Sequence, residues 1–205
     1  MNLSSEFKKI NNSKPKNYLD EYTNNIDCLI IRNLSKFDLE NTELLMSIAE
    51  FRNIYNYAFR NRFVANLKST HEWLSNDFFV NNKRILFLIF NSSNTLLAHI
   101  GLFTKNNDYL EIDNVIKNTK NNEFKMYEVL EGVERFSIKK FNVKSFRLKV
   151  LESNNRALNF YIQNGYSVVN KKNQKLLFKE GVEILSDTLD KNYDDRLLTL
   201  EKNIE

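Results

Sequence analysis

The chain has 205 residues, 42% apolar and 13% aromatic, so it can bury a hydrophobic core within one domain. Its 30 basic and 26 acidic side chains leave a net charge of +4 without a dense basic block, which argues against a nucleic-acid partner. The single cysteine excludes disulfide scaffolds and cysteine-rich metal sites. No stretch is apolar enough to span a membrane and no signal-peptide core is visible, so we expect a cytoplasmic protein.

The N-terminal segment is polar and contains the only proline, Pro15. We expect residues 1–25 to form an extension, with a short helix near Tyr18 to Tyr22, ahead of one domain over residues 26–205. A strand is predicted over about 26–33, where Cys28 opens an apolar run and is expected to pack rather than react.

Two helices are predicted next. Asp38 is a candidate N-cap for the first of them. The apolar side chains that recur there at helical spacing are Leu44, Leu45, Ile48 and Phe51. The run from Ser69 to Glu72 has the Ser-x-x-Glu form of a capping box, and it predicts the start of a second helix that carries Trp73.

Three strands joined by short polar turns follow. The apolar runs are Ile85–Phe90, Thr95–Phe103 and Tyr109–Ile116. Because the connections between them are short and rich in Asn and Ser, the runs predict an antiparallel meander.

The second half of the chain alternates helix and strand. An amphipathic helix is predicted over about 124–140, then a strand over 145–151 and a helix over 154–164. Residues 166–180 indicate one further strand, and Arg196–Lys202 a last one. The resulting order, β-α-α-β-β-β-α-β-α-β, predicts an α/β (α+β) fold. Its central sheet is mixed and mostly antiparallel, with helices on both faces.

The helix expected over 154–164 carries the pattern that bears most on function. Four residues at spacings of three, four and four lie on one face of it: Asn154, Ala157, Tyr161 and Gly165. Asn154 is expected to cap the helix, and Gly165 to end it in a left-handed turn. A phenol, Tyr161, therefore lies on the inner face of a helix that follows a strand directly.

This unit of strand, turn, helix and glycine resembles the second half of GNAT-superfamily acetyltransferases, and the element order resembles the GNAT fold over about residues 26–180. The resemblance implies that acetyl-CoA is the acetyl donor and that a primary amine attacks the thioester directly, without an acetyl-enzyme. It also implies that Tyr161 lies beside the sulfur of acetyl-CoA. A phenol keeps its proton at neutral pH and can give it to the departing thiolate. The alternative is a buried tyrosine that bonds a backbone group.

The strand expected over 109–116 supplies candidates for the base. At a period of two, Glu111 and Asp113 share one face, where either could accept the proton of the amine. Alternatively, both carboxylates are solvated or paired with lysine. His99, on the preceding strand, is a further candidate for base or substrate contact. Two isolated histidines give no metal-ligand spacing, so no metal site is expected.

The cofactor loop departs from the pattern of the resemblance. GNAT proteins carry a glycine-rich pyrophosphate loop here, whereas the run from Lys117 to Met126 contains no glycine. A helix N-terminus still offers N–H groups and positive dipole to an anion, and two lysines add charge, although Glu123 opposes it. Backbone N–H groups near Asn114 and Val115 are expected to polarise the thioester carbonyl. The expected cofactor contacts are Asn114, Val115, Lys117, Lys120, Asn122, Phe124, Lys125, Met126 and Asn154.

Three short motifs bear on the acceptor. They are Phe51-Arg52-Asn53, the run from Thr70 to Leu74, and Glu111-Ile-Asp-Asn-Val115. Together they resemble the GNAT branch that acetylates nucleotide-linked amino sugars. Aromatic faces and guanidinium groups suit a base or sugar with a diphosphate, although an amphipathic helix and its loop explain the same residues. The expected substrate contacts are Arg52, Arg62, Trp73 and His99.

Two alternatives stand beside this reading of the sequence. The first is an acetyltransferase that acts on a protein N-terminus or another small amine. The second is a GNAT-shaped binding module that no longer catalyses, which the glycine-free loop favours.

Overall fold

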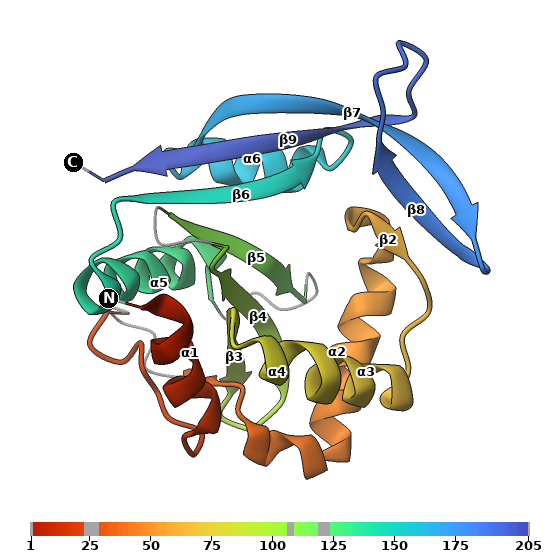
Figure 1. The fold of residues 1–205 in the computed structure, drawn as a ribbon. Coiled ribbons are helices and arrows are strands. Elements are labelled where there is room, and N and C mark those ends of the chain that lie inside the picture. The colour runs from red at the N-terminus through yellow and green to blue at the C-terminus, as the bar shows by residue number, and fades with distance from the viewer. Residues whose placement is uncertain (1, 23–28, 106–108, 119–123, 205) are drawn as a thin grey trace.

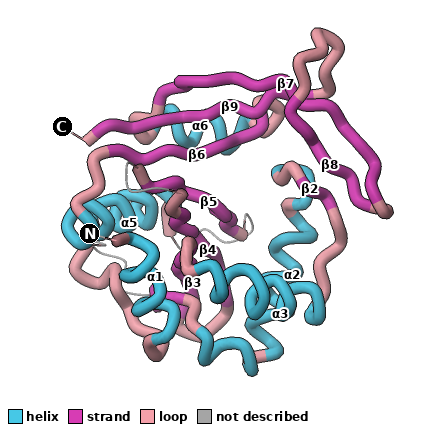
Figure 2. The backbone as a smooth tube through the Cα atoms, viewed as in Figure 1, coloured by secondary structure: helices cyan, strands magenta, loops and turns pink. Residues whose placement is uncertain are grey.

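The computed structural model describes residues 2–22, 29–105, 109–118 and 124–204. One sheet of nine strands runs through the molecule in the order β1-β3-β4-β5-β6-β9-β7-β8-β2, with helices on both of its faces (Figures 1 and 2). Among the described strands, β5 and β6 pair in parallel and the other neighbours are antiparallel. The predicted fold class is therefore confirmed.

The first half of the chain forms short helices around two edge strands. Its elements are α1 (Leu3–Asn12), β1 (Leu29–Asn33), the 3-10 helix η1 (Lys36–Glu40), α2 (Thr42–Ile54), the 3-10 turn η2 (Asn56–Ala58), β2 (Asn61–Arg62), α3 (Leu67–Trp73), the π-helical turn η3 (Leu74–Phe78) and α4 (Phe79–Asn81).

The predicted helix starts need correction. Ser35 caps η1, and Asp38 instead forms an ion pair of 2.9 Å with Arg32. Asn41 caps α2 by accepting a hydrogen bond from the backbone N–H of Leu44 at 3.1 Å. α3 starts two residues before Ser69, because Asn66 is the residue whose side chain accepts the N–H of Ser69, at 2.9 Å.

The N-terminal segment contains structure that its composition did not indicate. The short helix expected near Tyr18 is a turn, and a helix, α1, lies earlier. Leu3, Phe7 and Ile10 lie on the buried side of α1 and belong to the same hydrophobic cluster as the central strands. Cys28 lies outside the described residues.

The second half carries most of the sheet. Its elements are β3 (Arg84–Asn91), β4 (Leu96–Phe103), β5 (Leu110–Lys117), α5 (Met126–Phe141), β6 (Ser145–Leu151), α6 (Asn155–Gln163), β7 (Ser167–Lys179), β8 (Val182–Asp187) and β9 (Asp195–Asn203). The antiparallel register of β3, β4 and β5 confirms the predicted meander. The sequence did not predict β8, which pairs with β7 through a two-residue turn at Glu180-Gly181.

The sheet curls so that its last strand comes from the first half of the chain. β2, which lies between α2 and α3, pairs with β8 at Asn61–Ile184 and Arg62–Glu183 (Figure 1). Arg60, just before β2, donates from Nε to the carbonyl oxygen of Leu185 at 3.0 Å. The loop after α2 is thereby held beside the hairpin of β7 and β8.

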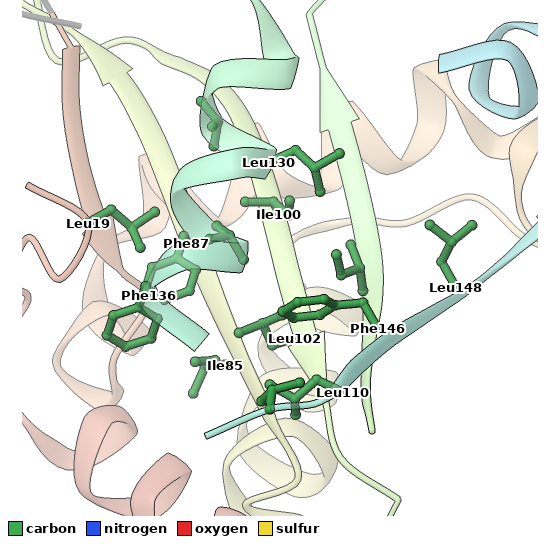
Figure 3. Close-up of a cluster of buried hydrophobic side chains, with 14 of the residues drawn as sticks. Leu19, Ile85, Phe87, Ile100, Leu102, Leu110, Leu130, Phe136, Phe146 and Leu148 are labelled. Carbon is green, nitrogen blue, oxygen red and sulfur yellow. The ribbon is translucent and has the colours of Figure 1, made fainter. Parts of the chain in front are cut away.

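Two hydrophobic clusters pack on the two faces of the central strands. Along β3, Ile85, Phe87 and Ile89 belong to one cluster, while Leu86, Leu88 and Phe90 belong to the other. This alternation is expected of a strand buried on both faces. α1 and α5 cover the first face, where Leu130 and Phe136 of α5 lie over the sheet (Figure 3). α2 and α3 cover the second.

Candidate active site

The two parallel strands at the centre of the sheet diverge. β5 and β6 pair only over Leu110–Ile112 and Phe146–Leu148. Beyond that point a cavity of about 380 Å³, called here the cleft, is lined by the rest of β5, by Lys149–Leu151 and by α6. Tyr55 and residues 57–60, from the loop that β8 holds, also line it. Unpaired strand ends and a helix thus surround a space open to a ligand.

A β-bulge lies on the β5 wall of the cleft. The register between β4 and β5 shifts between His99 and Gly101, and Asn114 takes a left-handed conformation with φ of 48°. A bulge places an extra residue outside the regular ladder of hydrogen bonds. It falls on Asn114 and Val115, the residues expected to polarise a carbonyl, and both line the cleft.

The opposite wall is α6, whose two ends are fixed as the sequence indicates. Asn154 caps the helix by accepting the N–H of Ala157 at 3.3 Å. At the other end Gly165 has φ of 87°, and its N–H donates to the carbonyl of Ile162 while that of Tyr166 donates to Tyr161, both at 3.1 Å. This is a Schellman closure.

Tyr161 faces the cleft from this helix. Asn154 and Ala157 line the same cavity, so three of the four residues of the sequence pattern meet there. Tyr161 is only 7% exposed and packs edge-on against Phe160 and Tyr166. Burial, with a smaller contribution from the charge of Asp113, raises the pKa of the Tyr161 phenol above its usual value. The phenol therefore stays protonated at neutral pH.

The two candidate carboxylates are in different environments. Both oxygens of Glu111 accept hydrogen bonds from Lys149 Nζ, at 2.9 and 2.8 Å. Asp113 Oδ2 accepts from Arg84 Nε at 3.2 Å, while its Oδ1 is buried and has no hydrogen-bond partner. Burial raises the pKa of Asp113, although Arg84 opposes the shift. Asp113 is thus the carboxylate with an acceptor oxygen that has no partner and with a raised pKa.

His99 lies on the other side of the bulge and is 4% exposed. Its Nδ1 lies 2.6 Å from the carbonyl oxygen of Asn114. A carbonyl only accepts, so Nδ1 carries the proton and Nε2 keeps a lone pair. Burial lowers the pKa of His99 to about 4, and the ring is neutral at pH 7.

A second cavity, of about 400 Å³, adjoins the cleft on the face covered by α2 and α3. It shares Phe59, Asn114 and Ile116 with the cleft. Arg52, Trp73 and His99, three of the four expected substrate contacts, line this second cavity. Arg62, the fourth, lines neither cavity and lies 3.7 Å from Glu183 on β8.

The expected cofactor residues separate into three groups. Asn114, Val115, Lys117, Met126 and Asn154 line the cleft. Lys120 and Asn122, like Glu123, lie outside the described residues. Phe124 is buried, and its carbonyl accepts a hydrogen bond from Lys117 Nζ, while the backbone N–H of Lys125 donates to Glu128 at 3.2 Å.

Arg156 is a cleft residue that was not predicted from the sequence. This residue lies in the first turn of α6 and lines the cleft. No ion pair of Arg156 is found within the described residues. Burial lowers the pKa of the Lys117 ammonium, and the positive charge of Arg156 lowers it further. Two cations therefore share one side of the cleft. A basic residue two positions after the helix cap was the signal for this arrangement.

Neither a metal site nor a membrane span is found in the described ranges. They hold no group of three or more His, Cys, Asp or Glu side chains that could bind a metal ion. No described helix is long and apolar enough to cross a membrane.

Comparison with known proteins points to one fold. No protein-family model matches the sequence, and no curated protein does. Among solved structures, a proposed phosphinothricin N-acetyltransferase superposes with a TM-score of 0.60 at 13% identity. The match covers 86% of this chain and 99% of the chain in that structure. A spermidine N-acetyltransferase from Vibrio cholerae, in complex with CoA and spermine, superposes with a TM-score of 0.61 at 13% identity. That match covers 86% of this chain and 96% of the spermidine N-acetyltransferase chain. At such low identity these matches establish the fold, which is that of GNAT-family N-acetyltransferases.

Proposed function

We propose that this protein is an acetyl-CoA-dependent N-acetyltransferase that acetylates a primary amine on a small molecule. One observation carries the proposal: a buried, protonated phenol faces a bulged strand across the space where β5 and β6 diverge. The shared fold with solved N-acetyltransferases supports it.

The residues of the cleft fit the donor. Acetyl-CoA supplies an acetyl group on a thioester and carries phosphates at its nucleotide end. Lys117 and Arg156 provide the positive charge that phosphates require, and the first turn of α5 adds its N–H groups and dipole. These features would compensate for the missing glycines, and the bulge at Asn114 would direct backbone N–H groups at the acetyl carbonyl.

The proton transfers follow from the side chains on the two walls. Asp113, whose Oδ1 has no partner and whose pKa is raised, takes the proton from the amine, directly or through water. The amine nitrogen then bonds to the acetyl carbon, and the carbon–sulfur bond breaks. Tyr161 gives its proton to the departing sulfur. Glu111 is held by Lys149 and serves to position that part of β5.

The acceptor class is broader than the sequence resemblance suggested. The two solved structures described above bear the names of a phosphinothricin and a spermidine N-acetyltransferase. A nucleotide-linked amino sugar remains one candidate within the class of small primary amines. Acetylation of a protein N-terminus and a binding module without catalysis are the alternatives.

A binding and turnover experiment tests the proposal. Calorimetry with acetyl-CoA should give saturable heat, and the release of free thiol should depend on an added amine from a panel of amino sugars, polyamines and amino acids. Binding without turnover on any amine or peptide would favour the inert module. No binding at millimolar acetyl-CoA would contradict the proposal.

A further inference from the structure

We propose that the acceptor carries an anionic group, a carboxylate or a phosphate, and that Arg52 binds this group in the second cavity. The inference rests on the proposed function and specifies its substrate class.

Arg52 is held in place by aromatic rings. The residue lies near the C-terminal end of α2, and its guanidinium carbon lies 3.6 Å from the ring centroid of Phe59 and 4.9 Å from that of Phe63. Nη2 donates to the carbonyl oxygen of Asn61. The planar group is thus fixed before any ligand arrives, so that little conformational entropy is lost when an anion binds.

The same guanidinium lacks a counter-ion. Nη1 is buried and has no hydrogen-bond partner, and no described carboxylate lies within ion-pair distance of Arg52. Burial lowers the pKa of Arg52 to about 10, which leaves it positive at neutral pH. A buried charged donor without a partner is costly, so its retention in the wall of a cavity calls for a ligand that supplies the partner.

The other charges of the second cavity are already matched. Arg84 lies 3.7 Å from Asp77 and 3.2 Å from Asp113, so its charge is balanced. His99 is neutral and offers only the lone pair of Nε2. Among the described charged side chains that line this cavity there are two cations, Arg52 and Arg84, and one carboxylate, Asp77, and only Arg52 lacks an opposite charge beside it. A polycation such as spermidine would be repelled by this lining, and an anion would be attracted.

The second cavity adjoins the cleft in which acetyl transfer is proposed, so one acceptor could reach both Arg52 and the donor. Asn114, the bulge residue, lines both the cleft and the second cavity. An acceptor whose amine reaches Asn114 would extend away from the donor, past His99, toward Arg52. The guanidinium fork matches the two oxygens of a carboxylate or phosphate, and a bidentate pair would fix the orientation of the molecule.

Matched amines test the inference. The pairs are glucosamine 6-phosphate with glucosamine, and phosphoethanolamine with ethanolamine, and spermidine serves as the polycation. The wild type should show kcat/KM values on the order of 10-fold or more higher for the anionic member of at least one pair. Arg52→Gln should lower that value roughly 10- to 100-fold, mainly through KM, and lower kcat/KM for the neutral member much less.

Two further variants serve as controls. Arg52→Lys keeps the charge but not the fork, and should recover part of the loss for the anionic member. Arg135→Gln removes an exposed arginine that pairs with Glu131 on α5, and it should leave kcat/KM unchanged for both members of each pair. Thermal unfolding of each variant checks that the fold is retained.

Binding of the same pairs, measured by calorimetry, separates the two proposals. Preferential binding of an anionic member without any turnover would contradict only the proposed function. Equal use of both members, preference for spermidine, an unchanged preference in Arg52→Gln, or no binding of any anionic member at millimolar concentration would overturn the role of Arg52.

Discussion

Two neighbouring tyrosines show how the surroundings of a side chain separate a chemical role from a structural one. The hydroxyl of Tyr166 donates to Glu134 Oε1 at 2.7 Å, and Glu134 Oε2 accepts from Lys202 Nζ at 2.6 Å. The hydroxyl of Tyr161 makes no hydrogen bond to a described residue, and its side chain lines the cleft. The hydroxyl of Tyr161 is thus available for the acid role proposed above, whereas that of Tyr166 satisfies a buried carboxylate.

Substituting each tyrosine by phenylalanine should therefore give opposite results. Tyr161→Phe removes the proposed acid and should lower kcat about 100-fold or more, while acetyl-CoA affinity and thermal stability stay close to wild type. Tyr166→Phe should reduce the free energy of unfolding by about 1–3 kcal/mol, because Glu134 loses a partner. Steady-state kinetics and urea unfolding measure the two effects. Wild-type kcat in Tyr161→Phe would contradict the assignment of the acid.

Gly101 is required by its close approach to Asp113. A Cβ atom at this position would overlap Asp113 Oδ1 and lie 3.0 Å from the Asp113 carbonyl oxygen. Gly101→Ala should therefore lower the free energy of unfolding by about 1–3 kcal/mol. The same change in an Asp113→Ala background should cost less, since the carboxylate is gone. A double-mutant cycle by urea unfolding measures this coupling, and strictly additive effects would contradict it.

At the scale of elements, the cap of α6 combines stability with function. Asn154 caps α6 and lines the cleft, whereas Asn41 caps α2 and does not line the cleft. Asn154→Ala and Asn41→Ala should each cost about 1 kcal/mol of unfolding free energy. Only Asn154→Ala should also raise the KM for acetyl-CoA. Equal KM values in the two variants would show that the cap of α6 has no part in the cleft.

Elements with strong local patterns were predictable from the sequence. The strand of residues 145–151 and the helix that follows it were found because alternation, an Asn cap and a glycine stop lie within a few residues of one another. α1 was missed because its polar side chains concealed Leu3, Phe7 and Ile10 at helical spacing. β8 was missed although Glu180-Gly181, with φ of 49° and 79°, forms the kind of turn that joins two strands of a hairpin.

The arrangement of the site was less predictable, since it depends on contacts distant in sequence. The pairing of Asp113 with Arg84 and of Glu111 with Lys149 distinguishes two carboxylates that the alternation of the strand makes equivalent. The lone pair of His99 depends on a bulge in a neighbouring strand. Arg52 and Arg62 are close in sequence, yet only the fold shows that one faces a cavity and the other a strand.

For the molecule as a whole, buried His99 couples stability to pH. In the unfolded chain its imidazole takes up a proton near pH 6.5, while in the folded protein it stays neutral down to about pH 4. The contribution of neutral His99 to the free energy of unfolding is therefore complete above pH 6.5. It is lost as the pH falls toward 4, and the loss amounts to at most about 3 kcal/mol. The raised pKa of Asp113 has the opposite effect, because the folded protein binds that proton more tightly than the unfolded chain and so gains stability as the pH falls.

A comparison of variants isolates the histidine. Between pH 7 and pH 5 the wild type should lose roughly 2 kcal/mol of unfolding free energy more than His99→Gln, because Asp113 titrates in both proteins. Urea unfolding at several pH values measures the difference. Parallel curves for the two proteins would show that His99 is not the group responsible.

The pairing of β2 with β8 also affects when one side of the cleft can form during synthesis. Arg60 is 125 residues from Leu185 and 127 from Asp187, to which it donates hydrogen bonds. Closing so long a loop carries an entropic cost, and contacts at that separation form late. On the ribosome, β5 and α6 emerge before the segment that holds Tyr55 to Arg60 against the cleft. A nascent chain arrested before β8 would thus lack the anchored loop, and it would also lack β9, whose Leu197 lines the cleft.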